Sequence, residues 1–410
     1  MGSKENFENM LINSAFRYEL DPNNVQRMLF NKAADIARFT WNWGLAARKQ
    51  LYEQKKGKER FTNVIDQNRE LNAIKKDQFP WMYEVSKCVP QESLRDLEAA
   101  YNMFRKNPKT GLPCFKKKGR CCDSFKFTGA IHIVDDRHVQ LPRIGVVRTK
   151  EFTTKLNGRI LSATVGREGN KWFVSFQVER EMEETTAPVG DPIGVDIGIL
   201  NFAVLSDGRF IKNSKILKQY YKKLRYVSRV HSRKQIGSNN RKKATYKLAG
   251  IHRKIKNIRK DNIHKLTTML AKNHSIIVIE DLNVREMIKN RRFVHSLGKI
   301  GMGMFRTMLE YKTQWYGSNL IIADRFYPSS KTCSSCGNVV DEMPLSKRLY
   351  KCANCGMVLD RDLNAARNLV ALSSRETLNA CGTGSFSHIA RCDEMTFDES
   401  GSKHHLKTSG

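Results

Sequence analysis

The chain has 410 residues, of which 72 are lysine or arginine and 41 are aspartate or glutamate, so its formal net charge is +31. This excess is far larger than solubility requires and predicts a polyanionic partner, most simply nucleic acid, with a membrane surface as the alternative. No apolar run reaches the roughly 18 residues that a membrane span needs, and the first residues lack the apolar core of a signal peptide. We therefore expect a cytoplasmic protein with no membrane partner and about two to four domains.

The N-terminal half contains patterns of both strands and helices. Residues 13–20 alternate between polar and apolar like a strand, and Asp21 and Pro22 then predict the start of a helix. Helical spacing of apolar residues continues to about residue 106. Short alternating runs separated by turn residues follow over 124–179 and predict a small antiparallel barrel. The helical block is therefore expected to be an insertion after the first strand of the barrel.

A second sheet is predicted by two apolar, β-branched runs that carry carboxylates. The run 192–199 contains Asp196, and the run 275–282 ends with Glu280 and Asp281. Burying a carboxylate in such a strand is costly unless the group is paired or holds a metal ion. Asp196 taken alone could equally be a residue that caps the turn after its strand.

The stretch between Asp207 and Asp261 contains no acidic residue. Its apolar residues keep helical spacing, which predicts a basic helical hairpin over 212–260 that turns near residues 237–240, with a separate helix starting at Asp261. A merely solvated face normally mixes both signs of charge, so an all-basic face is better explained by a phosphate backbone. The expected contacts are Lys222, Lys223, Arg225, Arg233, Lys242, Lys243, Lys254 and Arg259.

Lys116 lies in a second basic segment, 113–120, beside Phe115. Basic and aromatic side chains together suit phosphate contact and base stacking. Lys116 is therefore a further candidate for nucleic-acid binding, although a solvated loop would have the same composition.

Four of the ten cysteines form two CxxCG motifs, at 333–337 and 352–356. Two such knuckles bring four thiolates into a tetrahedron, which suits structural zinc; an iron–sulfur cluster or a redox pair is the alternative. All four ligand positions are cysteine, so none is left for a catalytic water. We expect one structural Zn²⁺ bound by Cys333, Cys336, Cys352 and Cys355.

A third acidic position follows the second knuckle directly. Asp360 fits a helix N-cap, and Asp362 fits the first turn, where the helix dipole favours a negative charge. Asp362 is also the third carboxylate, after Asp196 and Glu280, that a distant segment could bring to one site. Three such carboxylates can hold two Mg²⁺ ions about 4 Å apart, which is an arrangement for cutting phosphodiesters. Together with the basic surface, this pattern predicts a nuclease.

The order and spacing of these motifs resemble those of RuvC-type nucleases with an RNase H fold, specifically the transposon-encoded TnpB family, which is related to the compact type V CRISPR effectors. The resemblance covers about residues 15–370. The segments that carry it are 194–198, 279–282, 327–337, 352–356 and 360–366, and more loosely 91–97 and 111–116.

This resemblance implies an RNA-guided endonuclease that cuts both strands of DNA. It implies that Asp196, Glu280 and Asp362 are the catalytic acids, that they bind two Mg²⁺ ions, and that a guide RNA from the transposon end and target double-stranded DNA are the partners. It further implies that a short motif beside the target is read by the barrel and its insertion. The candidates for that contact are Lys87, Gln91 and Thr128.

The resemblance has one departure and leaves two alternative functions open. Cys114 occupies a position where the family often has arginine, which would weaken one phosphate contact. A non-catalytic zinc-ribbon regulator that binds DNA remains one alternative. A transposase that joins DNA ends remains the other.

The expected fold class is α+β with several domains, and we expect the protein to act as a monomer. A β-barrel (wedge) domain with a helical recognition insertion would precede an RNase H-like (RuvC) α/β nuclease domain with an inserted zinc ribbon. The expected bounds are 1–21 and 111–185 for the barrel, 22–110 for the insertion, 186–327 and 357–373 for the nuclease domain, 328–356 for the ribbon and 374–410 for a disordered tail.

Overall fold

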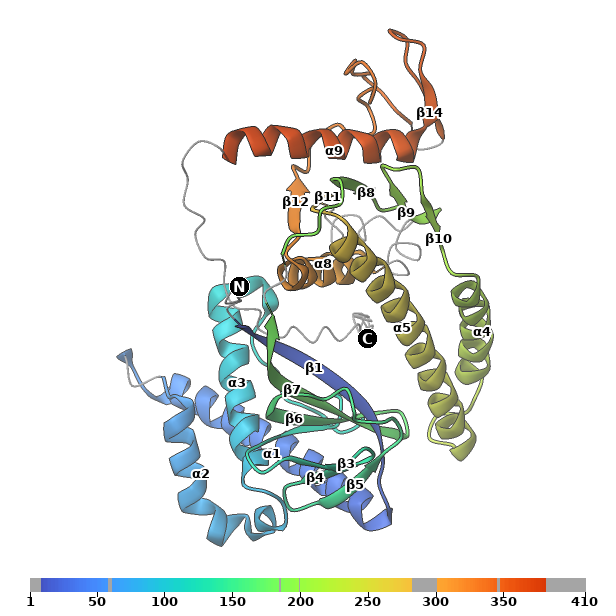
Figure 1. Cartoon of the computed structure of the whole chain (residues 1–410). Coiled ribbons are helices and arrows are strands. Elements are labelled where there is room, and N and C mark those ends of the chain that lie inside the picture. The colour runs from blue at the N-terminus through green and yellow to red at the C-terminus, as the bar shows by residue number, and fades with distance from the viewer. Residues whose placement is uncertain are drawn as a thin grey trace, which may run out of the picture.

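The computed structural model describes residues 9–57, 61–183, 186–198, 200–281, 301–344 and 347–380. These residues form two lobes, each built on one sheet (Figure 1). The N-terminal lobe, residues 9–183, carries a seven-stranded sheet, and the C-terminal lobe, residues 186–380, carries a five-stranded sheet. No helix in the described part of the chain combines the length and the apolarity needed to cross a membrane.

The sheet of the N-terminal lobe is antiparallel throughout, in the order β2-β6-β7-β1-β5-β4-β3. Alternate residues of its strands are buried, for example Val174, Phe176 and Val178, as expected for a sheet with one face on a core. The strands are β1 (Asn9–Asp21), β2 (Ser124–Thr128), β3 (His132–Asp135), β4 (His138–Leu141), β5 (Gly145–Thr149), β6 (Arg159–Glu168) and β7 (Lys171–Glu183).

This sheet does not close into the barrel that the strand pattern predicted. Among the described residues the edge strands β2 and β3 do not pair with each other, so the sheet stays open. The β3 edge is only four residues long and its pairing is irregular between Ile133 and Asp135. The β2 edge packs against a helix of the insertion instead. A short irregular edge and a helix-covered edge both protect a sheet without closure.

The predicted helical insertion after the first strand is confirmed. It consists of α1 (Asn24–Gln54), α2 (Val64–Gln78), the short 3₁₀ turns η2 (Pro80–Glu84) and η3 (Pro108–Thr110), and α3 (Cys88–Lys106). The cap of α1 is Asn23 and not Asp21, which ends β1: the side chain of Asn23 accepts the amide hydrogen of Gln26, and the side chain of Gln26 accepts that of Asn23, as in a capping box. Phe30 of α1 packs against Phe125 and Trp172 and so joins the insertion to the sheet.

The sheet of the C-terminal lobe has the order β10-β9-β8-β11-β12. Its strands are β8 (Ile193–Asp196), β9 (Asn201–Leu205), β10 (Phe210–Lys212), β11 (Ile276–Glu280) and β12 (Asn319–Ala323). β8, β11 and β12 are parallel, whereas β9 and β10 run antiparallel to their neighbours.

Helices cover both faces of this sheet. Ile277 and Ile279 pack in a core with α5 (Asn239–Asn273) and α8 (Met302–Tyr316), whereas Val278 packs with Leu369 of α9 (Arg361–Ala380). Figure 1 shows α9 lying across the sheet on the side away from α8. Burial on both faces explains why these strands are continuous apolar runs without polar alternation.

The basic hairpin consists of α4 (Lys215–Ser232) and α5 (Asn239–Asn273), with Ser238 as the N-cap of the second helix. The expectation that a separate helix starts at Asp261 is wrong, because α5 continues through this position. Neither glycine nor proline interrupts the sequence there. The side chain of Asp261 accepts a hydrogen bond from Lys265, one turn further along (2.7 Å), as i,i+4 pairs in a helix do.

The ribbon segment between β12 and α9 contains the hairpin of β13 (Leu349–Lys351) and β14 (Val358–Asp360). α9 then continues to Ala380, so the first part of the expected disordered tail, 374–380, is helical. The rest of that expected tail, 381–410, lies outside the described residues.

Candidate active site and metal centre

Sheet topology brings Asp196 and Glu280 to the same edge. β8 and β11 are adjacent and parallel, with Val195 opposite Ile279, and each of the two acids is the last residue of its strand. The carboxyl ends of parallel strands are where open α/β sheets bind ligands. The two carboxylates therefore share one end of the sheet although 84 positions separate their numbers.

α9 brings Asp362 to the same edge. A Cβ built on Gly194 of β8 would lie 2.0 Å from the carbonyl oxygen of Ala366, so the helix backbone rests directly on the strand. A Cβ on Gly198 would lie 3.9 Å from Oδ2 of Asp362. As predicted, Asp360 caps the helix: its Oδ1 accepts the amide hydrogens of Asp362 (2.9 Å) and Leu363 (3.1 Å).

The three carboxylates interact electrostatically. Burial raises the pKa of Asp196 well above its usual value, and the charges of Glu280 and Asp362 raise it further. Burial also raises the pKa of Glu280; the hydroxyl of Ser329 donates a hydrogen bond to its Oε1 and opposes that rise, while Asp362 adds to it. Repulsion among partly buried anions is relieved by bound cations, and carboxylate oxygens are the ligands that Mg²⁺ prefers.

Asp281 lies next to Glu280 in the sequence but has different partners. It forms ion pairs with Arg306 (2.7 Å) and Arg325 (2.8 Å). The hydrogen bond from Arg325 is the largest cause of the lowered pKa of Asp281. Glu280 instead interacts electrostatically with Asp196 and Asp362, so the two neighbouring acids have different surroundings.

The four cysteines of the ribbon converge as predicted. Among the described residues they form the one group of three or more acidic, histidine or cysteine side chains whose ligand atoms all lie within 4.8 Å of one another. The Sγ atoms of Cys333 and Cys355 are 3.6 Å apart and those of Cys336 and Cys352 are 3.5 Å apart. Zn–S bonds of ~2.3 Å in a tetrahedron require sulfur separations of ~3.8 Å, so the donor set fits zinc.

The two knuckles have the same backbone geometry. The amide of Gly337 donates to the carbonyl of Cys333 (2.9 Å), and the amide of Gly356 donates to that of Cys352 (3.1 Å). Both glycines have φ near +75° (75° and 72°), a conformation that only glycine adopts readily. The amide of Asn338 and the side chain of Asn354 donate to Cys336 and lower its pKa, whereas hydrogen bonds with the other cysteines outweigh the amide of Met357 and raise the pKa of Cys355.

Replacing Cys352 with serine is expected to remove the zinc and to unfold the ribbon, because the metal supplies much of the folding free energy of such small sites. Zinc content measured by inductively coupled plasma mass spectrometry should fall from about one ion per chain to well below half. Cys114→Ser, a substitution at an exposed cysteine outside the knuckles, is the control and should retain zinc. Full zinc content in the Cys352→Ser protein would contradict this ligand assignment.

The basic hairpin keeps its predicted basic residues on the outside, with one exception. Val227, Ile251 and Ile255 form the apolar contact between α4 and α5. Arg259 is partly buried and donates a hydrogen bond to the hydroxyl of Tyr221 (2.8 Å), so it braces the hairpin. The predicted residues that are exposed are Lys222, Lys223, Arg225, Arg233, Lys242, Lys243 and Lys254.

Sequence reasoning missed two exposed aromatic residues on this hairpin, Tyr226 and Tyr246. Exposed rings beside phosphate-binding cations are suited to stacking on bases. The sequence did contain a signal for them: both tyrosines lie among lysines and arginines, at positions outside the apolar face of their helix.

The structure brings Lys87, Gln91 and Thr128 to one corner of the N-terminal lobe. Lys87 is the exposed N-cap residue of α3, and Gln91 lies one turn further along the helix. The thiol of Cys88 donates to the carbonyl oxygen of Thr128 at the end of β2 (3.3 Å). The three candidates are thus neighbours in space, as a shared contact with one ligand requires.

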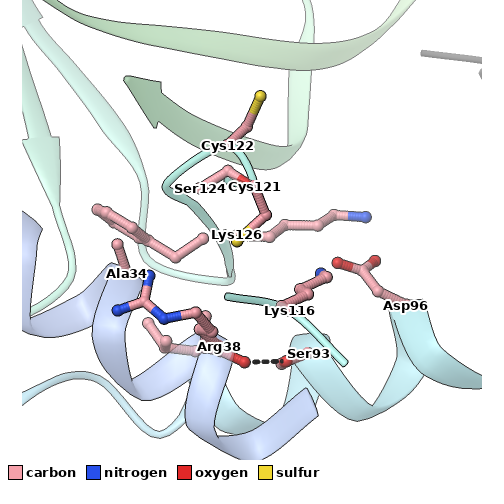
Figure 2. Close-up of a pocket in the computed structure, with 12 residues that line it drawn as sticks. Ala34, Arg38, Ser93, Asp96, Lys116, Cys121, Cys122, Ser124 and Lys126 are labelled. Carbon is pink, nitrogen blue, oxygen red and sulfur yellow. Dashed lines mark hydrogen bonds between the residues drawn. The ribbon is translucent and has the colours of Figure 1, made fainter. Parts of the chain in front are cut away.

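Lys116 belongs to the loop before β2 and packs against helices of the insertion. Its ammonium lies 3.7 Å from the ring centre of Trp41, and Figure 2 shows it beside Asp96 in a small pocket. Burial lowers the pKa of Lys116 and raises that of Asp96. Its backbone also exchanges hydrogen bonds with the side chain of Asn42. The exposed side chain of Lys117 is better located for a phosphate contact.

Three family models match this chain. One described as "Probable transposase" matches residues 175–291, one described as "Cas12f1-like, TNB domain" matches 303–369, and one described as "Helix-turn-helix domain" matches 10–58. A protein of Streptomyces pristinaespiralis named "Putative RNA-guided DNA endonuclease" is 32% identical over 378 residues, which cover 91% of this chain and 92% of the relative. The chain belongs to the TnpB family.

Other relatives of this TnpB protein agree with that assignment. InsQ of Escherichia coli K12, named "Putative RNA-guided DNA endonuclease", is 31% identical over 385 residues, with coverage of 90% of this chain and 94% of the relative. Among solved structures, a Cas12f1 chain in a complex with sgRNA and target DNA has a similar fold. Its TM-score is 0.52 at 14% identity, with coverage of 88% of this chain and 99% of that one.

The matched segments contain the site described above. The first family model spans Asp196, the hairpin and Glu280, and the second spans the four cysteines and Asp362. The segment matched by the third differs from its description: in this TnpB protein, the described residues of 10–58 form β1 and the single helix α1.

Proposed function

We propose that this TnpB protein is an RNA-guided endonuclease, encoded by a transposon, that cuts double-stranded DNA by hydrolysis of phosphodiester bonds. The observation that carries the proposal is the meeting of Asp196, Glu280 and Asp362 from three distant segments at one edge of the sheet. The names of relatives that are similar along most of the chain support the same activity. The protein would act in the cytoplasm and as a single copy.

The topology of the C-terminal lobe supports an RNase H-like (RuvC) nuclease domain. Its first three strands form an antiparallel meander; the fourth strand then pairs in parallel with the first, and the fifth pairs in parallel with the fourth. The acids at the ends of the first and fourth strands and at the start of the last helix fit the expected catalytic positions.

The donor set fits divalent magnesium. Within the described residues, the ligand atoms of the four ribbon cysteines all lie within 4.8 Å of one another. The oxygens of the three carboxylates do not form such a group. Three carboxylates from separate segments can share two ions about 4 Å apart. Bound there, magnesium would activate the attacking water and neutralise charge on the leaving oxygen.

The residues around the acids have separate tasks in this proposal. Asp196, Glu280 and Asp362 would hold the metal ions, and the Ser329 hydroxyl would orient the carboxylate of Glu280. Arg348 of the ribbon and Arg361 lie 3.6 Å and 3.2 Å from the oxygens of Asp362 and limit the repulsion it experiences. Both arginines are also cations close to where a phosphate would bind.

The hairpin of α4 and α5 would bind the guide RNA or the DNA backbone. Replacing Lys222, Lys223 and Arg225 with glutamine should weaken binding of the guide RNA. With fewer phosphate contacts, binding releases fewer counterions from the RNA. The slope of log affinity against log salt should decrease by about 0.7 per contact for a single strand. Filter binding at several salt concentrations measures this slope.

The control for this measurement keeps the charge at all three positions by exchanging lysine for arginine and arginine for lysine. It should retain most of the salt dependence, since the counterion effect depends on charge. An unchanged slope in the glutamine variant would exclude this face of the hairpin from the RNA interface.

The experiment that tests the function starts with the RNA that co-purifies with the protein. Its sequence defines the guide, and a DNA library with a matching target and randomised flanks then supplies any target-adjacent motif. Guide-dependent breaks in both strands support the endonuclease. Guide-independent DNA binding without cleavage would favour the zinc-ribbon regulator instead, and strand-transfer products would favour the transposase.

A further inference from the structure

A network of buried polar side chains connects the zinc ribbon to Glu280. Its central residues are Ser329, in the segment after β12, and Asn364 and Asn368 of α9. Their exposed fractions are 5%, 0% and 4%, respectively. Buried polar groups are costly unless each is hydrogen-bonded, so a satisfied network of this kind constrains the geometry of its members.

The end of the network at the acidic site is Ser329. β12 is the strand next to β11, with Ala323 opposite Glu280, so the chain leaving β12 passes beside the Glu280 carboxylate. The hydroxyl of Ser329 donates to Oε1 of Glu280. This bond holds one oxygen of the carboxylate that interacts electrostatically with Asp196 and Asp362.

The position of Ser329 is itself fixed by α9. The side-chain amide of Asn368 donates to the carbonyl oxygen of Ser329 (2.7 Å) and to that of Thr332 (2.6 Å). The hydroxyl of Tyr327 donates back to the backbone carbonyl of Asn368 (3.0 Å). The segment 327–332 is therefore attached to the helix that starts beside Asp362.

The other end of the network is the first zinc knuckle. Asn364 lies one helical turn before Asn368, on the same face of α9. Its side chain donates to the carbonyl of Thr332 (2.7 Å) and accepts the amide hydrogen of Ser334 (2.9 Å). Thr332 and Ser334 flank the zinc ligand Cys333, so the two asparagines join the knuckle to the helix of Asp362 and to the segment that holds Glu280.

We infer that Ser329 and Asn368 are positioning residues that fix the Glu280 carboxylate for metal binding and couple its orientation to the zinc knuckle. The inference rests on the proposed function, in which Glu280 is a metal ligand. Partners that orient a metal ligand typically contribute about 10–100-fold to metal affinity. Asn368 acts only through Ser329 in this scheme, so its effect should disappear when the serine hydroxyl is absent.

The test measures Mn²⁺ binding by electron paramagnetic resonance on the full protein with its co-purified RNA. Specific binding is the difference from the Asp196→Ala protein with the same RNA. Ser329→Ala should raise the Mn²⁺ dissociation constant about tenfold or more. Ser329→Thr, which keeps the hydroxyl, should restore affinity to within about threefold of the wild type. Ser335→Ala, the same change at an exposed serine of the ribbon, is the matched control and should bind like the wild type.

A double-mutant cycle separates positioning from general destabilisation. Asn368→Ala alone should weaken Mn²⁺ binding, whereas adding it to Ser329→Ala should cause no further loss. Wild-type affinity in the Ser329→Ala protein, or fully additive losses in the cycle, would overturn the inference. Absence of any Asp196-dependent Mn²⁺ binding in the wild type would instead overturn the proposed metal site on which the inference depends.

Discussion

Replacement of Asp196, Glu280 or Asp362 with alanine is expected to abolish cleavage of guide-matched DNA while the guide RNA still co-purifies. Each acid would hold a metal ion that stabilises the transition state by several kcal/mol, so the loss should be on the order of 10³-fold or more. Single-turnover cleavage with the protein in excess over DNA measures this rate. The hairpin of α4 and α5, which we propose binds nucleic acid, is a separate element of the C-terminal lobe, and RNA binding should therefore persist.

Asp281→Asn is the matched control for the Glu280 substitution. It changes the neighbouring acid, which pairs with two arginines near the surface, and such exposed pairs contribute little to stability. Cleavage by this variant should stay close to the wild-type rate. Full cleavage by Asp362→Ala would contradict the assignment of the third acid, and Asp360 would then be the substitute.

The same acids should show a cost to stability in the absence of magnesium. The pKa of Asp196 is raised in the folded protein, so its ionised form at neutral pH opposes folding. This cost is absent at low pH, where the group is protonated, and appears as the pH rises. Asp196→Asn should therefore increase the melting temperature of the protein in magnesium-free buffer. The buffer should contain no chelator, because a chelator would also remove the zinc. A decrease would argue against repulsion among the acids.

Gly194→Ala is expected to inactivate the protein through a contact with α9, without changing any of the three acids. The added Cβ would lie 2.0 Å from the carbonyl oxygen of Ala366 and 3.1 Å from Cβ of Leu369. Backbone atoms cannot yield as a flexible side chain can, so α9 must move away from β8 and carry Asp362 with it. Overpacking of this kind typically costs about 1–3 kcal/mol and occasionally more. We expect a lower melting temperature and a cleavage rate reduced at least about tenfold.

Gly303→Ala is the matched control for this prediction. Gly303 lies in α8, a Cβ added there would meet no atom within 4 Å, and its φ is an ordinary helical one. Alanine is favoured over glycine in a helix by about 0.5–1 kcal/mol, so this variant should be as stable as the wild type or more so. The rate of amide hydrogen exchange in α9 should increase in the Gly194→Ala protein but not in the Gly303→Ala protein. Wild-type stability and cleavage in the Gly194→Ala protein would show that α9 tolerates the displacement.

Several features could be predicted from local sequence because each depends on residue type and spacing. The knuckle glycines and cysteines define a zinc site within 24 positions, and the strand-terminal location of Asp196 and Glu280 follows from the apolar runs before them. The insertion after β1 was also recognisable, from the change between alternating and helical periodicity. These signals act within one element and do not require knowledge of the partner element.

Other features depended on packing between elements. The predicted barrel remains an open sheet, with α3 packed against β2, a contact that no strand pattern reports. The predicted helix start at Asp261 failed because a carboxylate in the middle of a long helix can pair with a lysine one turn away. Asn364 and Asn368 resembled ordinary polar residues of a helix until their partners on the ribbon were known.

The sequence by itself determined the chemical groups available to this protein: three carboxylates after apolar runs or at a helix start, four thiolates in two knuckles, and a long basic hairpin. Tertiary structure alone decided that Asp281 is paired with Arg306 and Arg325, and that the zinc knuckle is joined to the acidic site through α9. The physical reason is that charge and spacing are local properties of a chain. The orientation of a carboxylate depends instead on neighbours such as Ser329 and Arg325, which only folding brings beside it.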